Sequence, residues 1–332
     1  MFREDNIEKI DWTSIDEEKL KQLGLSSEEI DQIENPDAGG TSALVYFVEK
    51  SGRSMAIKKD FNIDPLENSS REHVVLRLLE GRGGRKISPH SYYSNNGKSI
   101  LITERIHGEK ISELQESDIK EIAALMAFLH KPTFRRFGLP LKRRQEGNQL
   151  DRINQQIDFL SGWLEEISKV IELSEFDFNV LRRMLDALIS KINAEKIKFQ
   201  DNTFSLIHYD LNPNNIIRSY QGNILFLDWR QAFIGDRAAD IAKFFYKNYL
   251  NNEQKDVFWE EYLQSIDDET IKERAAIYDL LVRLGSILWR LRFINIDSKK
   301  NPQLLKEVDI NIVQSRLNED INCLEKVLQI KK

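Results

Sequence analysis

Leu206-Ile-His-Tyr-Asp-Leu-Asn-Pro-Asn-Asn-Ile-Ile217 is the stretch that decides the fold of this 332-residue chain, together with Ile224-Leu-Phe-Leu-Asp-Trp229, which follows it closely. Each joins an apolar run to polar residues, so we expect a strand-loop-strand unit that brings Asp210, Asn215 and Asp228 together. Phosphoryl transfer uses these residue types, because one carboxylate accepts a hydroxyl proton while a second carboxylate and an amide oxygen hold Mg²⁺. Asp, Asn and Pro are also common in turns, so the loop taken alone fits an ordinary turn equally well.

The spacing of these residues is more specific than their types. His208-x-Asp210-x4-Asn215, with Asp228-Trp229 after an apolar strand, resembles the catalytic and metal-binding loops of the protein-kinase-like superfamily. In protein kinases, Asp-Phe-Gly stands where this chain has Asp228-Trp229.

A third element, Gly235-Asp-Arg-Ala-Ala-Asp240-Ile-Ala, follows soon after. With the two loops it resembles the aminoglycoside phosphotransferase / choline kinase family, whose pattern is His-Gly-Asp-x4-Asn, Asp-Trp and Gly-Asp-x3-Asp-Leu-Ala. This chain departs from that pattern by Tyr209 in place of Gly and Ile241 in place of Leu. Neither change removes a catalytic group.

The resemblance implies a role for each matching residue. Asp210 is the expected catalytic residue, and Asn215 and Asp228 are the expected Mg²⁺ ligands. His208 and Asp240 are expected to support the catalytic loop structurally. The implied cofactors are ATP and Mg²⁺.

The N-terminal part of the chain predicts a small sheet with one helix. Residues 37–104 follow the order β-β-α-β-β, with strands at 43–48, 54–58 and around the Asn96-Gly97 turn, and a helix at 69–80. Before them, Ser14 with Glu17 and Ser26 with Glu29 have the spacing of a capping box, which predicts two short helices separated by Gly24.

By the same resemblance, this small lobe binds the nucleotide. Gly39, Gly40 and Ser42 are similar to the family's Gly-Gly-x-Ser-Asn loop over the phosphates, with Ala43 in place of Asn. Two glycines alone are also compatible with a plain β-turn.

A lysine, a helix glutamate and a linker complete the implied nucleotide site. Lys58 lies in a strand-like run, 14 residues before Glu72 of the predicted helix, and the two are expected to form an ion pair. Arg71 and His73 flank Glu72 and are expected to face solvent. The linker around Glu104 and Ile106 is expected to hydrogen-bond adenine through its backbone, which leaves the choice between ATP and GTP open.

The C-terminal part predicts mainly helices, interrupted by short strands at 204–207, 215–218 and 223–227. The helical patterns cover residues 118–130, 149–171, 177–196, 238–250, 253–266, 270–294 and 303–329. The stretch 132–148 has the composition of an irregular basic loop. The predicted fold class is therefore α+β, a protein-kinase-like bilobal fold with a small antiparallel N-lobe and a large helical C-lobe. The expected division is an acidic helical segment packed on the N-lobe at 1–36, the N-lobe at 37–106 and the C-lobe at 107–332.

Composition excludes several classes of protein. The chain is 41% hydrophobic, which is too apolar for disorder, and it has no apolar run near the length of a membrane span. A single cysteine, Cys323, and an N-terminus without an apolar leader predict a cytoplasmic protein. With 54 acids against 48 bases, the chain lacks the basic character of a nucleic-acid binder. We expect no nucleic-acid or membrane partner, and a monomer or weak homodimer.

The distribution of charge bears on the acceptor. Residues 1–40 hold 12 acids and 4 bases, so the other 292 residues carry a net charge of +2. The overall charge of −6 is thus no evidence for a cationic substrate. Only 11 residues separate Asp228 from Asp240, and no Ala-Pro-Glu follows, so the docking platform of a protein kinase is absent from the sequence.

The predicted function is transfer of the γ-phosphoryl group of ATP to a hydroxyl of a metabolite or antibiotic. The acceptor stays open among an aminoglycoside, another antibiotic, an amino alcohol, a sugar and an amino acid. The alternatives are a protein kinase, a nucleotide-binding regulator without turnover and a helical scaffold without a nucleotide site.

Overall fold

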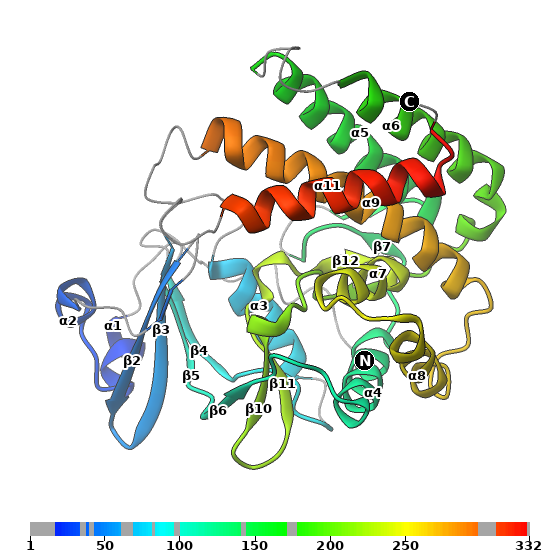
Figure 1. Ribbon diagram of the computed structural model, residues 1–332. Coiled ribbons are helices and arrows are strands. Elements are labelled where there is room, and N and C mark those ends of the chain that lie inside the picture. Colours follow the sequence, from blue (N-terminus) through cyan, green and yellow to red (C-terminus); the bar gives the residue numbers. More distant parts are fainter. Residues whose placement is uncertain are drawn as a thin grey trace.

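A five-stranded antiparallel sheet forms one side of the computed structural model, and helices form most of the rest (Figure 1). The structure describes residues 17–33, 38–39, 43–60, 69–81, 84–95, 100–140, 144–170, 178–297 and 310–330. The sheet order is β1-β2-β3-β5-β4, and the strands are β1 (Ala38–Gly39), β2 (Ala43–Lys50), β3 (Arg53–Asp60), β4 (Ser91–Asn95) and β5 (Ile100–Glu104). The predicted α+β class is confirmed.

The strands pair as their turn residues require. Ser51 and Gly52 join β2 to β3 and both have positive φ, at 51° and 70°, as the tightest hairpin turns need. Helix α3 (Ser69–Glu80) lies beside this sheet and buries Val75 and Leu76 of its predicted apolar stripe.

Two short helices, α1 (Glu17–Gln22) and α2 (Ser27–Gln32), cover part of the sheet. Leu20 and Ile30 pack with Met55 and Ile57 of β3 in one apolar cluster. The predicted capping box of Ser26 with Glu29 is present, and Gly24 between the helices has φ +73°. Ser14 lies outside the described residues.

Small sheets connect the first sheet to the helices. Strand β6 (Gly108–Lys110) pairs with β10 (Ile216–Ser219), which also pairs with β11 (Ile224–Phe226). A Cβ at Gly108 would lie 2.2 Å from the carbonyl oxygen of Arg218, so this close pairing requires glycine. Strands β9 (Ser205–Ile207) and β12 (Phe233–Gly235) form a second pair.

The predicted basic loop at 132–148 is less irregular than expected. Within its described part, β7 (Arg136–Phe137) pairs with β8 (Gln145–Glu146). Aromatic packing holds this region, because Phe137 and Phe204 are both buried with their ring centroids 5.1 Å apart. The described basic residues of this stretch therefore belong to the surface of the small unit that β7 and β8 form.

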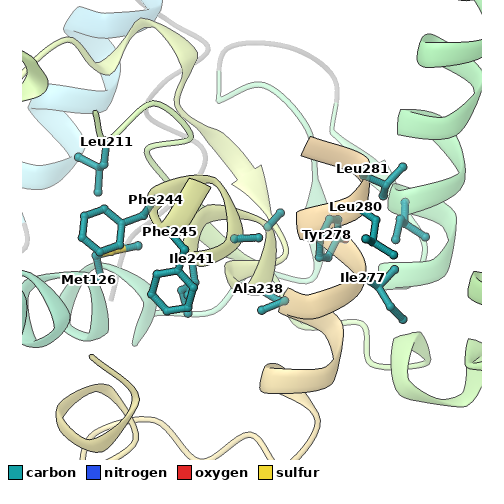
Figure 2. Close-up of a cluster of buried hydrophobic side chains, with 14 of the residues drawn as sticks. Met126, Leu211, Ala238, Ile241, Phe244, Phe245, Ile277, Tyr278, Leu280 and Leu281 are labelled. Carbon is teal, nitrogen blue, oxygen red and sulfur yellow. The ribbon is translucent and has the colours of Figure 1, made fainter. Parts of the chain in front are cut away.

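Seven long helices make up most of the described helical part, in which α9 packs against α5, α6, α7 and α11, and α4 packs against α8 (Figure 1). They are α4 (Glu116–His130), α5 (Gln149–Ser168), α6 (Phe178–Ala194), α7 (Arg237–Lys247), α8 (Asn252–Tyr262), α9 (Ile271–Arg292) and α11 (Ile310–Val327). Figure 2 shows the core between them, where Ile241 and Phe244 of α7 meet Met126 of α4. Helices were expected over all of these segments, although the structure starts or ends most of them a few residues away from the predicted bounds. No helix of the described residues combines the length and apolar character needed to cross a membrane.

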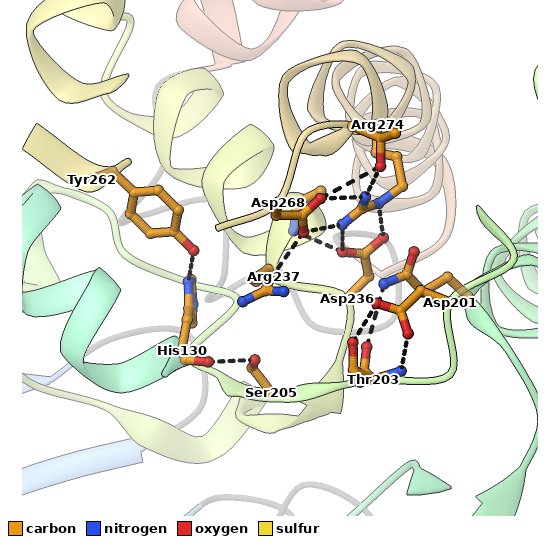
Figure 3. A network of polar contacts seen from close by, with 12 residues as sticks. His130, Asp201, Thr203, Ser205, Asp236, Arg237, Tyr262, Asp268 and Arg274 are labelled. Carbon is orange, nitrogen blue, oxygen red and sulfur yellow. Dashed lines mark hydrogen bonds and ion pairs between the residues drawn. The ribbon is translucent and has the colours of Figure 1, made fainter. Parts of the chain in front are cut away.

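A buried ion-pair network fixes the start of α7 (Figure 3). Arg274 of α9 is 1% exposed and donates to Asp236 at 2.9 and 3.1 Å and to Asp268 at 3.0 and 2.9 Å. Asp236 also caps α7 by accepting from the backbone N–H of Ala238 at 3.0 Å. Arg237 adds an ion pair to Asp268 at 3.1 Å. The helix that follows the Gly235-Asp236 motif is thereby anchored to α9.

The expectation that Arg71 and His73 face solvent is wrong. They are 7% and 6% exposed, and His73 Nδ1 lies 2.6 Å from Ser91 Oγ. Burial, together with nearby cationic groups, lowers the pKa of His73 to about 3. The side of α3 that carries these residues faces β4, which the sequence pattern of charged residues could not indicate.

This buried imidazole predicts a pH dependence of stability. The pKa of His73 is about 3 in the folded chain and about 6.5 in an unfolded one. Between these two pKa values the unfolded chain therefore binds more protons than the folded chain. The stabilisation that comes from burying neutral His73 is complete above about pH 6.5 and declines as the pH falls. We expect His73→Asn to reduce the difference between the free energies of unfolding at pH 7.5 and pH 5 by about 2 kcal/mol. Urea unfolding at both pH values measures this difference, and His107→Asn, at an exposed site, is the control. Equal differences in the unmodified protein and in both variants would refute the assignment of the pH dependence to His73.

Candidate functional site

The loop at 208–215 joins β9 to β10 and is anchored to α7 by hydrogen bonds. Asp240 of α7 is 1% exposed and accepts hydrogen bonds from the backbone N–H groups of His208 and Tyr209 at 2.9 and 2.7 Å. His130 Nε2 lies 3.1 Å from the same carboxylate. Burial raises the pKa of Asp240, but His130 and the two amides outweigh it, so the pKa is lowered. A buried carboxylate therefore fixes the loop, in the geometry expected for Asp240.

His208 connects this loop to the segment after β11. Its ring is 0% exposed, its Nε2 lies 2.8 Å from the carbonyl oxygen of Leu227, and its Nδ1 accepts from the N–H of Asp210 at 3.2 Å. Since Nδ1 accepts, Nε2 carries the proton and donates to Leu227. The imidazole has the bracing contacts expected of it, and it fixes the backbone of Asp210 relative to that of Asp228.

Asp210 and Asn215 face each other across the loop. Asn215 Nδ2 donates to the carbonyl oxygen of Asp210 at 2.8 Å and to its Oδ2 at 3.3 Å. No hydrogen bond from a described residue to Asn215 Oδ1 is present, so this amide oxygen is available to a cation. The side chain of Asp210 is half-buried, which leaves it open to a ligand.

Lys58 of β3, Glu72 of α3 and Asp228 meet where the sheet faces the loops. Lys58 Nζ lies 2.6 Å from Glu72 Oε2 and 2.7 Å from Asp228 Oδ1. Glu72 Oε1 also accepts from the N–H of Trp229 at 3.1 Å. Burial lowers the pKa of Lys58, but the two carboxylates outweigh it and the pKa is raised. The predicted pairing of Lys58 with Glu72 is present.

Arg230 is a site residue that the sequence did not reveal. Its guanidinium donates to both oxygens of Asp228, at 2.9 and 3.1 Å. Burial opposes ionisation of Asp228, but Lys58 and Arg230 outweigh it and hold its pKa far below the usual range. Asp228 also has φ +58°, a left-handed conformation that is uncommon outside glycine. The only available signal was its position two residues after Asp228.

The donor set fits a magnesium ion bound through few protein ligands. Asn215 offers an amide oxygen, and Asp228 Oδ2 accepts one bond from Arg230, while a carboxylate has about four acceptor sites. Mg²⁺ takes hard oxygen ligands and fills the rest of its octahedron with water and phosphate. The described residues contain no cluster of three His, Cys, Asp or Glu suited to a metal.

The linker expected to bind adenine leaves β5 at Glu104. The Glu104 carboxylate is engaged by Lys86 at 2.6 Å and by the N–H of His90 at 3.0 Å. In the described residues, the backbone N–H and C=O of Ile106 make no backbone hydrogen bond. The predicted contact of this main chain with adenine stays a prediction.

The glycine loop is described only in part. Gly39 lies in β1 and pairs with Leu44 of β2. Gly40 and Ser42 lie outside the described residues, so their predicted contact with phosphates stays a prediction.

Four aromatic residues of α7 and α9 divide into two groups. Phe244, Phe245 and Tyr246 of α7 are buried, whereas Trp289 of α9 is 42% exposed. Phe245 and Tyr246 also line a cavity of about 230 Å³. None of the candidate nucleotide or catalytic residues lines this cavity, so it is separate from the loops described above.

The family of the chain follows from a comparison with known proteins. A model of the phosphotransferase enzyme family matches residues 34–278, so the chain belongs to that family and is a phosphotransferase, as its sequence predicts. A search of curated proteins finds no match.

Solved structures share its fold at low sequence identity. Choline kinase LicA from Streptococcus pneumoniae aligns at TM-score 0.63 and 18% identity, covering 90% of this chain and 97% of that one. An ethanolamine kinase of Plasmodium vivax aligns at TM-score 0.60 and 20% identity, covering 88% and 82%. The aminoglycoside phosphotransferase APH(4)-Ia, in a ternary complex with ADP and hygromycin B, aligns at TM-score 0.62 and 17% identity, covering 93% and 98%. The fold is therefore protein-kinase-like, as predicted.

Proposed function

We propose that this phosphotransferase is an ATP- and Mg²⁺-dependent kinase that transfers the γ-phosphoryl group to a hydroxyl of a small molecule. The observation that carries the proposal is the array of Lys58, Glu72 and Asp228, joined through His208 to Asp210. It combines a cation for phosphates, a carboxylate for a metal and a second carboxylate for an acceptor proton, which is the inventory of phosphoryl transfer.

The roles follow from charge and position. Lys58, held by Glu72, contacts the α- and β-phosphates, and the backbone at Glu104 and Ile106 binds adenine. Gly39, Gly40 and Ser42 cover the phosphates. Mg²⁺, when bound, neutralises charge on the transferring phosphoryl group.

The remaining residues act on the acceptor and on the metal. Asn215 and Asp228 hold the metal. Asp210 orients the acceptor hydroxyl and receives its proton, while His208 and Asp240 keep the loop in place. Catalysis then depends mainly on positioning and electrostatic stabilisation.

The length of the segment after Asp228 favours a small acceptor over a protein. Between Asp228 and Asp240 the chain forms one short 3₁₀ turn (Trp229–Gln231), strand β12 and the start of α7. This leaves no segment to dock a peptide. The proposed division is a nucleotide-binding N-lobe at 37–106 and a C-lobe at 107–332 that holds the acceptor, with 1–36 packed on the N-lobe.

Nucleotide binding is the first test of this function. ATP with Mg²⁺ at 100 times its dissociation constant should raise the free energy of unfolding by about 2.7 kcal/mol, visible as a higher melting temperature. ADP release in the presence of hydroxyl compounds then distinguishes a kinase from a regulator that binds nucleotide without turnover. The absence of any stabilisation by ATP with Mg²⁺ would contradict the proposal.

Lys58 gives a sharper test inside the nucleotide site. We expect Lys58→Met to lower kcat/KM for ATP at least about 100-fold, because a charge-assisted contact to phosphate is lost and Glu72 and Asp228 are left facing each other. Lys59→Met is the matched control, since Lys59 is the next residue of β3 and lies over the ring of Tyr46 instead. Steady-state ADP release measures both variants. A kcat/KM for Lys58→Met within threefold of the unmodified protein would remove Lys58 from the nucleotide site.

A further inference from the structure

Two cations and two aromatic rings form a half-buried cluster beside Asp210. Tyr209 precedes Asp210 in the loop, and its ring meets that of Phe233 edge-on with centroids 5.1 Å apart. Lys243 Nζ lies 4.3 Å from the centre of the Tyr209 ring, and the Arg152 guanidinium lies 4.7 Å from that of Phe233. We call these four residues the Tyr209 cluster. They come from the loop, from the start of β12, from α5 and from α7, and each is half-buried, so a ligand can reach them.

Helix α7 brings a second lysine to the same place. Asn248, which follows the last residue of α7, donates to the carbonyl oxygen of Leu211 at 2.7 Å. With Lys243 against Tyr209, this contact places the last turn of α7 against residues 209–211. Lys247 is one turn beyond Lys243 and adjacent to Asn248, and both lysines lie close enough to Asp210 to be attracted by its carboxylate.

The positive charge of these lysines is only partly balanced by nearby carboxylates. Neither Lys243 nor Lys247 has an ion pair with a carboxylate of the described residues. Burial lowers the pKa of Lys243, and attraction to Asp210 and Asp240 only partly offsets this. Burial likewise lowers the pKa of Lys247, and repulsion by Lys243 adds to the shift. Asp240 is already satisfied by His130 and two backbone amides.

Such a site disfavours a cationic acceptor for two reasons. An ammonium group would enter beside two lysines of its own sign, which costs free energy in a half-buried site. Lys243 and Arg152 already lie over one face of the Tyr209 ring and of the Phe233 ring, so a quaternary ammonium would have to displace a cation from these faces to use them as an aromatic cage.

We propose that the acceptor of this kinase is an anionic hydroxyl compound, whose carboxylate or phosphate binds Lys243 and Lys247 while its hydroxyl faces Asp210. This inference rests on the proposed kinase function and names its substrate class. In the reaction, the acceptor oxygen bonds to the γ-phosphorus as the bond to the β,γ-bridging oxygen breaks, the hydroxyl proton passes to Asp210, and ADP leaves. The lysines stay bound to the anionic group and position the acceptor, with Arg152 as a further cation on the α5 side.

The test compares hydroxyl compounds that differ in charge. ADP release and thermal shifts are measured with panels of sugar acids and hydroxy acids, sugar phosphates, neutral sugars and polyols, and amino sugars, amino alcohols and aminoglycosides. We expect the highest kcat/KM, and saturable binding, in the carboxylate or the phosphate panel, and comparison of those two panels identifies the anionic group. The inference is overturned if a neutral or cationic compound has the highest kcat/KM, or if no anionic compound binds.

Variants connect that preference to the two lysines. Lys243→Gln and Lys247→Gln should each raise KM for the best anionic acceptor at least tenfold, with stabilisation by ATP and Mg²⁺ kept. Lys255→Gln is the charge-matched control, because Lys255 lies over Phe245 and lines the separate cavity. Lys247→Glu should move the preference toward cationic compounds. Unchanged KM in both glutamine variants would overturn the assignment of the anionic group to these lysines.

The two proposals fail differently. If ATP with Mg²⁺ does not stabilise the unmodified protein, the kinase function itself is wrong. If the nucleotide stabilises the protein and a cationic acceptor is phosphorylated, the kinase function stands and only the anionic acceptor is excluded.

Discussion

Asp210→Asn should lower kcat about a thousandfold while leaving ATP binding nearly intact. General acid-base catalysis by a positioned side chain contributes roughly 10²- to 10⁴-fold, and the amide of asparagine can neither accept the acceptor proton nor carry its charge. Asp210 makes no ion pair with Lys58 or Arg230 among the described residues, so the phosphate site should persist. The side-chain amide oxygen of the new asparagine can still accept from Asn215 Nδ2, which lies 3.3 Å from Asp210 Oδ2, so the loop should keep its conformation.

Single-turnover phosphoryl transfer and thermal shift by ATP with Mg²⁺ measure the two effects separately. Asp158→Asn, at an exposed position of α5, is the matched control and should retain kcat within twofold. A kcat above about a tenth of the unmodified value in Asp210→Asn would mean that another group accepts the proton.

Arg274→Met should cause the largest loss of stability. The change removes the only described cation that contacts both Asp236 and Asp268 and leaves two buried carboxylates facing each other. Breaking a buried ion pair in this way costs about 3–5 kcal/mol, a large share of the total stability of a typical domain. We expect the melting temperature to fall by roughly 10 °C.

The control for this variant is a surface ion pair of the same chemistry. Arg316 pairs with Glu319 at 3.0 Å, and both side chains are substantially exposed. Arg316→Met should therefore change the free energy of unfolding by less than about 1 kcal/mol. Equal effects of the two substitutions on urea unfolding would contradict a structural role for the buried network.

The local motifs could be predicted because their physical reasons are local. Within the loop from His208 to Asn215, several contacts join residues two to five apart in the sequence, such as Asn215 with Asp210. Strand and helix patterns similarly follow from periodicity and capping, as the Ser26 cap shows. The pair of Lys58 and Glu72 was implied by the family resemblance, which sets a strand lysine against a helix glutamate.

The residues that escaped prediction depend on tertiary packing. Lys243 and Arg152 reach the loop from two different helices, and nothing in their sequence neighbourhoods distinguishes them from solvated surface charges. His73 was misplaced for the same reason, since the side of α3 that meets β4 is set by the sheet and not by the helix pattern. Sums of charge over long regions also could not reveal Lys243 and Lys247, because the paired charges of other residues dominate such sums.

The pairing of β6 with β10 has a consequence for how the molecule can move. Because β6 belongs to the same small sheet as the hairpin of β10 and β11, a rotation of the first sheet about the few residues between β5 and β6 would have to break the hydrogen bond from the N–H of Phe226 to the carbonyl oxygen of Ile87. Such a hinge would change the separation of Lys58 from Asp228. It would leave Asp210 and Asp228 at a constant spacing, since His208 ties their backbones together on one side of the pivot. Opening would therefore change the proposed nucleotide site without disturbing the alignment of the two carboxylates.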